Sequence, residues 1–267
     1  MITAGQVKEL RERTGAGMMD CKKALGETNG DLDEAIALLR KKGAASAEKK
    51  AGRIAAEGVV QLLISDDASC GTLLEVNCET DFVAKDDSFN GFAAALTHLI
   101  VSQNPADVEA LSTLTMASGA SVEAERQELI AKIGENISIR RFETLVAETG
   151  KIAGYMHGTR IGVLVSTSGV GELGRDLAMH IAASRPVCIS EADMPSDVLT
   201  REREIYTAQA AESGKSPEIV EKMVDGRVKK FLKENTLLGQ PFVKNPDISV
   251  AELLSQGNAS MDGMLRF

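Results

Sequence analysis

Apolar residues recur at three- and four-residue steps in three short runs within residues 1–43. Thr3 and Gln6 have the spacing of a capping box ahead of the first run. Gly15 and Gly17 separate the first run from the second, and an Asn-Gly turn separates the second from the third. The pattern predicts three short helices in a compact bundle, near the lower size limit for a domain that folds alone.

The stretch that follows, residues 40–53, is rich in alanine and carries six basic residues against one acidic residue. Alanine favours helix, whereas the two glycines in this stretch weaken it. The composition therefore predicts a partly helical, solvated linker. A contact of the basic cluster with RNA or with an acidic partner is the alternative.

A β-hairpin is predicted next, because two runs rich in branched apolar residues, Val59–Ile64 and Thr72–Val76, flank a polar turn. A helix follows, with apolar residues at helical spacing from Phe89 to about Ser102. The loop between strand and helix, Asn77–Lys85, places an aromatic residue beside a carboxylate. Such loops often carry function.

Two interpretations of Asp81 and Phe82 in this loop are open. In the structural one, Phe82 packs against the following helix and Asp81 caps it. In the functional one, the loop presents the aromatic ring and the carboxylate to a partner. The spacing alone favours the structural interpretation.

Apolar periodicity is weak over residues 106–120, which predicts a surface excursion before Ser121 begins another helix. A second unit then repeats the plan of the first. We expect a strand over 137–148, a hairpin over 151–166 and a helix over about 172–184. This weak internal duplication of small antiparallel sheets backed by helices predicts an α+β core.

The character of the chain changes after Pro195. Residues 197–213 and 216–234 are predicted to form a helical hairpin that projects from the core, with Ile205 and Ile219 among its inward apolar residues. Pro241-Phe242-Val243 then returns the chain to the core, and the last residues are strand-like.

These elements predict three parts, which a chain of 267 residues is long enough to hold. Residues 1–54 form the helical bundle with its linker. Residues 55–140 form the N-terminal part of the core. Residues 141–267 form the C-terminal part, with the helical hairpin inserted at about 190–236.

Composition narrows the functional classes. The net charge of -9 argues against a nucleic-acid footprint, and the sequence shows neither a long apolar run nor a leader that would indicate a membrane or export. Four scattered cysteines fit a reducing cytoplasm. Three histidines and no tryptophan offer little for acid–base or metal chemistry, so we expect no catalytic residue, metal ligand or cofactor. His98 and His180 lie on apolar helix faces and are predicted as core or edge residues.

One motif points elsewhere. Gly169–Gly174 fits the G-x-G-x-x-G fingerprint, follows a predicted strand, opens a predicted helix and has Glu191 about twenty residues further on. Against this, the flanking strands are predicted to be antiparallel hairpins, without alternating βαβ units. A turn is favoured, and a dinucleotide-binding enzyme is kept as a distant alternative.

Six segments together carry a resemblance to a known family: Val7–Leu25, Thr80–Val83, Gly134–Ile137, His157–Gly158, Met179–Ser184 and Gln240–Val243. They span the chain, and their joint occurrence in this order is highly specific. The chain resembles bacterial elongation factor Ts, the family of guanine-nucleotide exchange factors for elongation factor Tu.

The resemblance implies a ubiquitin-associated-like (UBA-like) N-terminal bundle, a two-part α+β core and an inserted antiparallel coiled coil. It implies elongation factor Tu, both GDP-bound and nucleotide-free, as the partner in cytoplasmic protein synthesis. No direct contact with nucleic acid or membrane is expected. A homodimer through the helical hairpin is left open.

The resemblance also implies a wedge made by Thr80, Asp81, Phe82 and Val83. Phe82 would enter the partner near its Mg²⁺ and phosphate site and displace helices there. Asp81 would compete for contacts linked to Mg²⁺.

Further binding residues follow from the same resemblance. Arg11, Met18 and Met19 would contact the GTP-binding domain of elongation factor Tu, and His157 would face a more distant domain. From the residues alone, the two methionines are either core filler, the commoner case, or an adaptable contact surface.

Two other functions stay open, namely a helical-bundle adaptor for another protein and the dinucleotide enzyme. Members of the family usually continue beyond the strand that ends here at Phe267. We therefore expect either a short gene product or a truncated sequence.

Overall fold

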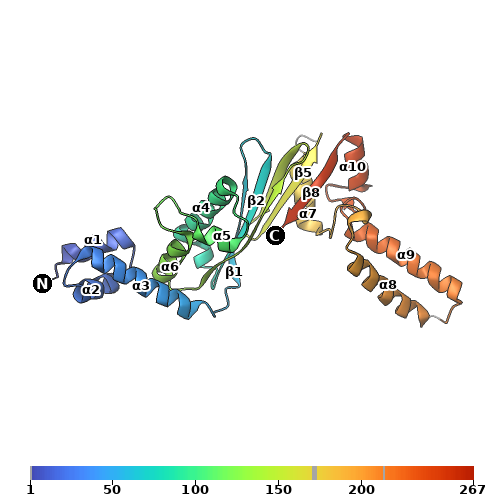
Figure 1. Cartoon of the computed structure of the whole chain (residues 1–267). Coiled ribbons are helices and arrows are strands. Elements are labelled where there is room, and N and C mark those ends of the chain that lie inside the picture. Colours follow the sequence, from blue (N-terminus) through green and yellow to red (C-terminus); the bar gives the residue numbers. More distant parts are fainter. Residues whose placement is uncertain (1, 170–172, 213) are drawn as a thin grey trace. The chain divides into compact units, whose positions relative to one another are not determined.

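The computed structural model describes residues 2–169, 173–212 and 214–267 of the chain, and Figure 1 labels many of its elements. It divides into two compact units, Met1–Leu63 with Thr72–Glu143 and Ile64–Gly71 with Thr144–Phe267. Helices combine with small antiparallel sheets, so the predicted α+β class is confirmed. The predicted boundaries of the three parts stay predictions.

The N-terminal bundle consists of α1 (Ala4–Thr14), α2 (Met18–Glu27) and α3 (Leu32–Lys50). Thr3 and Gln6 form the predicted capping box, and Gly15 ends α1 in the left-handed conformation at φ 65°. The three helices bury a small core of their own: Val7, Leu10, Cys21, Ala24, Leu25 and Ala35. The predicted bundle is confirmed.

The linker predicted at residues 40–53 is largely a continuation of α3, which runs unbroken to Lys50. Gly43 and Ala47 are buried on it. The helix persists because it packs against α6 (Val122–Ile133), and a Cβ added to Gly43 would lie 3.6 Å from that of Ala131. Tertiary packing here overrides the weak helical preference of a glycine-containing sequence.

The first sheet has the order β1-β2-β3, from β1 (Glu57–Ile64), β2 (Cys70–Cys78) and β3 (Ile137–Val146). The predicted first hairpin is confirmed. The strand at 137–148, however, was predicted to open the second unit and instead completes this first sheet. Its side chains Ile137 and Ile139 join a core with those of α4 (Asp87–Gln103) and α6.

The predicted surface excursion at 106–120 is wrong. It contains a short helix, α5 (Val108–Thr113), which Asp107 caps and which packs against α6. Leu111 is fully buried and Met116 nearly so. A six-residue helix is too short to show a period, and its single inward leucine is enough to hold it on the core.

The second sheet has the order β4-β5-β8, with both pairings antiparallel. Its strands are β4 (Lys151–His157), β5 (Ile161–Ser168) and β8 (Ser260–Arg266), and α7 (Leu173–Ser184) packs on β4 and β5. Each sheet is therefore a hairpin followed by a helix and then, much later in sequence, by a strand that pairs with the second hairpin strand. The two sheets therefore share one arrangement, which is the similarity that the predicted weak internal duplication refers to.

Short elements close the core of the second unit. They are the 3₁₀ turn η2 (Glu191–Asp193), β6 (Pro241–Phe242), β7 (Asn245–Ser249) and α10 (Val250–Gln256). His180 is fully buried there: its Nε2–H donates to Gln240 Oε1 at 2.9 Å, and its Nδ1 accepts from the Val243 N–H at 3.1 Å. His180 is thus the predicted core histidine, whereas His98 is exposed.

The predicted helical hairpin is confirmed as α8 (Ser196–Ala211) and α9 (Pro217–Asn235), which pack against each other. The inner positions predicted on α9 at Val224 and Val228 are buried, but Ile205 and Ile219, also predicted to face inward, are 40% and 47% exposed. Leu199 and Tyr206 occupy the inner face of α8 instead. They lie seven residues apart, two helical turns, and therefore share one side of the helix.

Candidate functional site

The candidate wedge loop joins the end of β2 to the start of α4. It contains the 3₁₀ turn η1 (Val83–Lys85), after which Asp86 caps α4. The Asp86 carboxylate accepts from the N–H groups of Ser88 and Phe89 at 2.9 and 3.1 Å. Hydrogen bonds from Ser88 and Phe89 hold the pKa of the Asp86 carboxyl below its usual range.

Phe82 lies on the outside of this loop and is 81% exposed. Asp81 is exposed as well, and its carboxylate accepts from Lys85 Nζ at 2.8 Å. The structural interpretation is therefore wrong, because Phe82 does not pack as a staple and Asp86 is the cap. Val83, by contrast, is buried in the core of the first unit, so the exposed ring is next to a fixed point.

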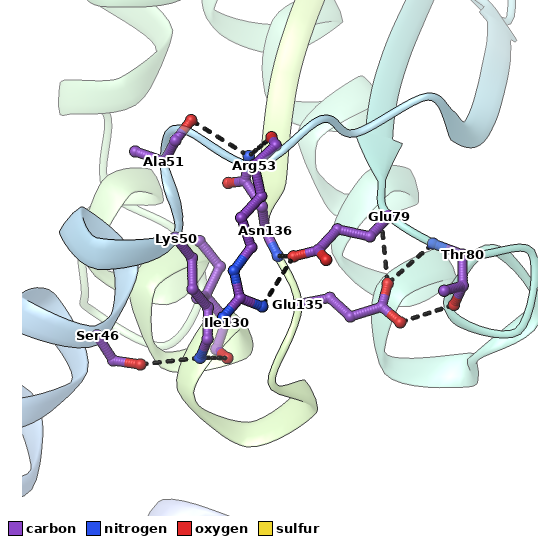
Figure 2. Close-up of polar contacts among 9 residues, drawn as sticks. All are labelled: Ser46, Lys50, Ala51, Arg53, Glu79, Thr80, Ile130, Glu135 and Asn136. Carbon is purple, nitrogen blue, oxygen red and sulfur yellow. Dashed lines mark hydrogen bonds and ion pairs between the residues drawn. The ribbon is translucent and has the colours of Figure 1, made fainter.

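Thr80 anchors the other side of the loop through Glu135 (Figure 2). Its N–H donates to Glu135 Oε2 at 3.0 Å, and its hydroxyl donates to Glu135 Oε1 at 2.7 Å. The Thr80 Oγ1 also accepts from the Val83 N–H at 3.4 Å. Phe82 is thus held between two anchored neighbours. Sequence reasoning assigned no role to Glu135.

Cys78 also supports the loop, and sequence reasoning assigned no role to it. Its side chain is fully buried, and its thiol donates to the Thr80 carbonyl at 3.2 Å. Burial, together with the nearby carboxylates of Glu135 and Glu57, raises the pKa of the Cys78 thiol to about 11. The thiol is therefore neutral at physiological pH, where it acts as a packing group and a hydrogen-bond donor.

The bundle presents the other predicted contact residues of the first unit. Met18 and Met19, in the first turn of α2, are 60% and 62% exposed, and Arg11 on α1 is exposed too. The core-filler interpretation of the two methionines is therefore wrong. Flexible, polarisable thioether side chains at the surface suit an adaptable apolar contact.

His157 belongs to the second unit, at the end of β4. It is exposed, and its Nδ1 lies 3.2 Å from the Tyr155 hydroxyl, while the two rings tilt toward each other. The bond restrains the imidazole without burying it, so its ring is accessible at the strand end.

A cleft of about 250 Å³ lies between the bundle and α6, lined among others by Lys23, Leu39 and Lys132. None of its lining residues comes from the wedge loop or from the surface of Met18 and Met19. The exposed candidate residues Phe82, Met18 and Met19 therefore lie outside this cleft.

The described glycines of the fingerprint, Gly169 and Gly174, have structural roles. Gly169 has a φ of 80°, and a Cβ on Gly174 would lie 2.7 Å from that of Ala153, so these glycines permit a turn and the close packing of α7 on β4. Residues 170–172 lie outside the described part of the chain. Since both neighbours of β5 are antiparallel, the strand context of a dinucleotide fold is missing from this sheet.

Within the described ranges, no three or more His, Cys, Asp or Glu residues are grouped so that they could hold a metal ion. A search of the described helices finds none with the length and apolar character to cross a bilayer.

Comparisons with known proteins identify relatives over the whole chain. A family model described as elongation factor TS matches residues 79–267. The chain is 59% identical over 268 residues to elongation factor Ts of Thioalkalivibrio sulfidiphilus, covering all of this chain and 91% of that protein. It is 55% identical to the elongation factor Ts of Methylococcus capsulatus with the same coverage, and 57% identical to that of Nitrosomonas eutropha over 97% of this chain and 88% of that protein.

Proposed function

Because this chain belongs to the elongation factor Ts family, a family of factors in protein synthesis, we propose that it binds elongation factor Tu and accelerates the release of GDP. GTP then takes the vacant site. The proposed role needs no bond-making chemistry, catalytic residue or cofactor on this chain.

The observation that carries the proposal is the placement of Phe82. A large apolar side chain that is 81% exposed gains nothing from the core of its own unit. Its neighbours are fixed, with Val83 buried and Thr80 bonded to Glu135. A rigid, protruding aromatic ring of this kind suits insertion into a pocket of a partner.

Exchange follows from thermodynamic linkage. A factor that binds the nucleotide-free partner more tightly than the GDP form weakens GDP binding by the same factor. A population shift of four orders of magnitude requires roughly 5.5 kcal/mol of differential affinity. In our proposal Phe82 supplies part of it by occupying volume that the GDP form fills with its own helices.

Asp81 supplies an electrostatic part of this differential affinity. The Mg²⁺ that accompanies GDP belongs to the partner and is held by oxygen ligands. A carboxylate brought near that site competes for the contacts that hold the ion, and a weakened ion holds the β-phosphate less firmly. The Lys85 partner of Asp81 must then be displaced or carried along.

Further contacts are proposed for Arg11, Met18 and Met19 with the GTP-binding domain of elongation factor Tu. His157 is proposed to meet a more distant domain. Action in the cytoplasm and a homodimer through α8 and α9 remain predictions. The exposed Ile205 and Ile219 are the apolar positions that such a dimer would cover.

Stopped-flow release of fluorescent GDP from elongation factor Tu tests the proposal. The full chain is expected to raise the release rate by orders of magnitude. Phe82→Ala is expected to lower the rate at saturation by roughly tenfold or more, because one buried aromatic anchor is worth about 2 kcal/mol or more. Its effect on complex formation should be smaller.

Ile54→Ala is the matched control, since Ile54 is an 85% exposed apolar side chain of the same unit outside the wedge loop. It should leave the release rate unchanged. A chain that binds elongation factor Tu without accelerating release would refute exchange and support the adaptor alternative. A Phe82→Ala chain with the wild-type rate at saturation would refute the wedge.

A further inference from the structure

Two carboxylates, Glu79 at the start of the wedge loop and Glu135 after α6, tie the base of the loop to the segment that follows α6. Glu135 Oε2 accepts from the N–H groups of Glu79 and Thr80 at 3.2 and 3.0 Å, and its Oε1 accepts from the Thr80 hydroxyl at 2.7 Å. Glu79 Oε1 in turn accepts from the Asn136 N–H at 2.6 Å. Each segment thus binds the backbone of the other, as Figure 2 shows, and we call this arrangement the carboxylate clasp.

The clasp joins segments that are far apart in sequence. Glu79 follows β2, whereas Glu135 follows α6 directly after Gly134, which ends that helix at a φ of 93°. A left-handed residue turns the chain sharply at a helix end and suits glycine. The turn sets Glu135 beside the loop rather than along the helix axis.

The end of α3 is tied to the same point. The Asn136 side-chain amide donates to the Arg53 carbonyl at 2.9 Å, and Arg53 Nη1 lies 3.4 Å from Glu79 Oε1. Lys50 Nζ donates to the Ile130 carbonyl at 3.5 Å, close to the end of α6. The segment that leaves the bundle and the wedge loop therefore share one polar network.

Hydrogen bonds to a charged acceptor are stronger than neutral ones, and three of them converge on one half-buried carboxylate. They fix the backbone immediately before Asp81 and Phe82. None of these bonds involves the exposed side chains themselves. The clasp consequently determines where the ring is held without taking part in its contacts.

We propose that Glu135 is a positioning residue for exchange, which holds the loop of Asp81 and Phe82 rigid so that the ring displaces its target instead of yielding. This inference rests on the proposed exchange function. A loop that must be ordered on binding spends interaction energy on its own ordering, and that energy is lost to the displacement. Glu135 therefore affects the rate of GDP release at saturation more than it affects the affinity for elongation factor Tu.

Glu135→Ala removes all three charge-assisted hydrogen bonds and is expected to slow GDP release at saturating factor by roughly tenfold or more. The concentration for half-maximal release should change less than about threefold, since the contact surface is intact. Glu135→Gln retains one accepting oxygen and should fall between wild type and Glu135→Ala. Glu123→Ala is the control, because Glu123 bonds Arg126 and Gln127 on α6 and not the loop.

Two readouts separate positioning from general damage. Amide hydrogen exchange should show faster exchange at Glu79 and Thr80 in Glu135→Ala, with α4 protected as in wild type. In a double-mutant cycle, Glu135→Ala should have little further effect on release once Phe82 is alanine, because Glu135 acts through that ring.

Unchanged exchange at Glu79 and Thr80 would refute the clasp itself. Faster exchange at both amides with a wild-type release rate would refute the positioning role while leaving the proposed function standing, as would full additivity with Phe82→Ala. If Phe82→Ala also released GDP at the wild-type rate, the wedge would fail first and the positioning role with it.

Discussion

At the scale of single residues, Phe82, Phe89 and Phe92 lie close in sequence but in opposite environments. Phe89 and Phe92 are buried in the first core, whereas Phe82 is 81% exposed. Helical spacing predicted the inward direction of Phe89 and Phe92. Phe82 precedes the periodic run, so no helical pattern decides its side, and the spacing alone favoured a packing role over a binding role.

The residues that anchor Phe82 were beyond sequence reasoning for a different reason. The Thr80–Val83 segment was singled out, but Glu79, Glu135 and Asn136 were not given a role. Hydrogen bonds between positions more than fifty residues apart depend on the fold. A single sequence shows which residues are able to accept a bond and does not show which donors come near them.

His180 makes stability depend on pH. Burial lowers the pKa of its imidazole, so the unfolded chain binds the proton more readily than the folded chain. The stabilisation is present above the unfolded pKa of about 6.5 and is lost as pH falls below it. Protonation also places a proton on Nδ1, which accepts from the Val243 N–H.

We therefore expect the free energy of unfolding to decrease from pH 7.5 toward pH 5, with a His180 contribution of at most about 1.4 kcal/mol per pH unit. Chemical denaturation across this range measures it. His180→Gln should flatten the slope, and His98→Gln, at an exposed position, should not. An equal slope in wild type and His180→Gln would contradict the assignment.

At the scale of elements, α5 tests how much a short helix contributes to the free energy of unfolding. Leu111→Ala removes a fully buried side chain and should lower the free energy of unfolding by about 2–4 kcal/mol. Thr113→Ala, at an exposed position of the same helix, should change it by less than about 0.5 kcal/mol. Denaturant unfolding measures both. A neutral Leu111→Ala would restore the interpretation of residues 106–120 as a surface excursion.

Element positions were largely predictable, whereas the partners of the elements were not. The hairpins, the capped helices and the strand at 137–148 follow from apolar periodicity and caps, which are local. β3 pairs in the first sheet, where Ile137 and Ile139 join the core of that unit, and α3 continues to Lys50 because α6 covers it. Both outcomes depend on packing between distant segments, which a local pattern does not contain.

At the scale of the whole molecule, the α8–α9 hairpin is a nearly independent insertion. Its core consists of its own residues, among them Ala210, Val224 and Val228. At its base the chain leaves and returns at one place, where the Val187 N–H donates to the Asn235 carbonyl at 2.8 Å and the Leu237 N–H donates to the Cys188 carbonyl at 2.9 Å.

Replacing residues 197–231 with a short Gly-Ser linker should therefore leave the rest of the chain folded. We expect a loss of helical circular dichroism and a single remaining unfolding transition within a few degrees of the wild type, because surface insertions tolerate length changes. Loss of the β4-β5-β8 sheet, seen by amide exchange, would show that the hairpin supports the core.

The late arrival of β8 also bears on how the chain reaches its native state. Val163 on β5 pairs with Arg266 on β8, and the entire helical hairpin is synthesised between them. Contacts between residues so far apart in sequence form slowly, whereas the local contacts between α8 and α9 form fast. During synthesis on the ribosome, one edge of β5 therefore stays open until β8 emerges. Until then, that edge is exposed to mispairing with another nascent chain.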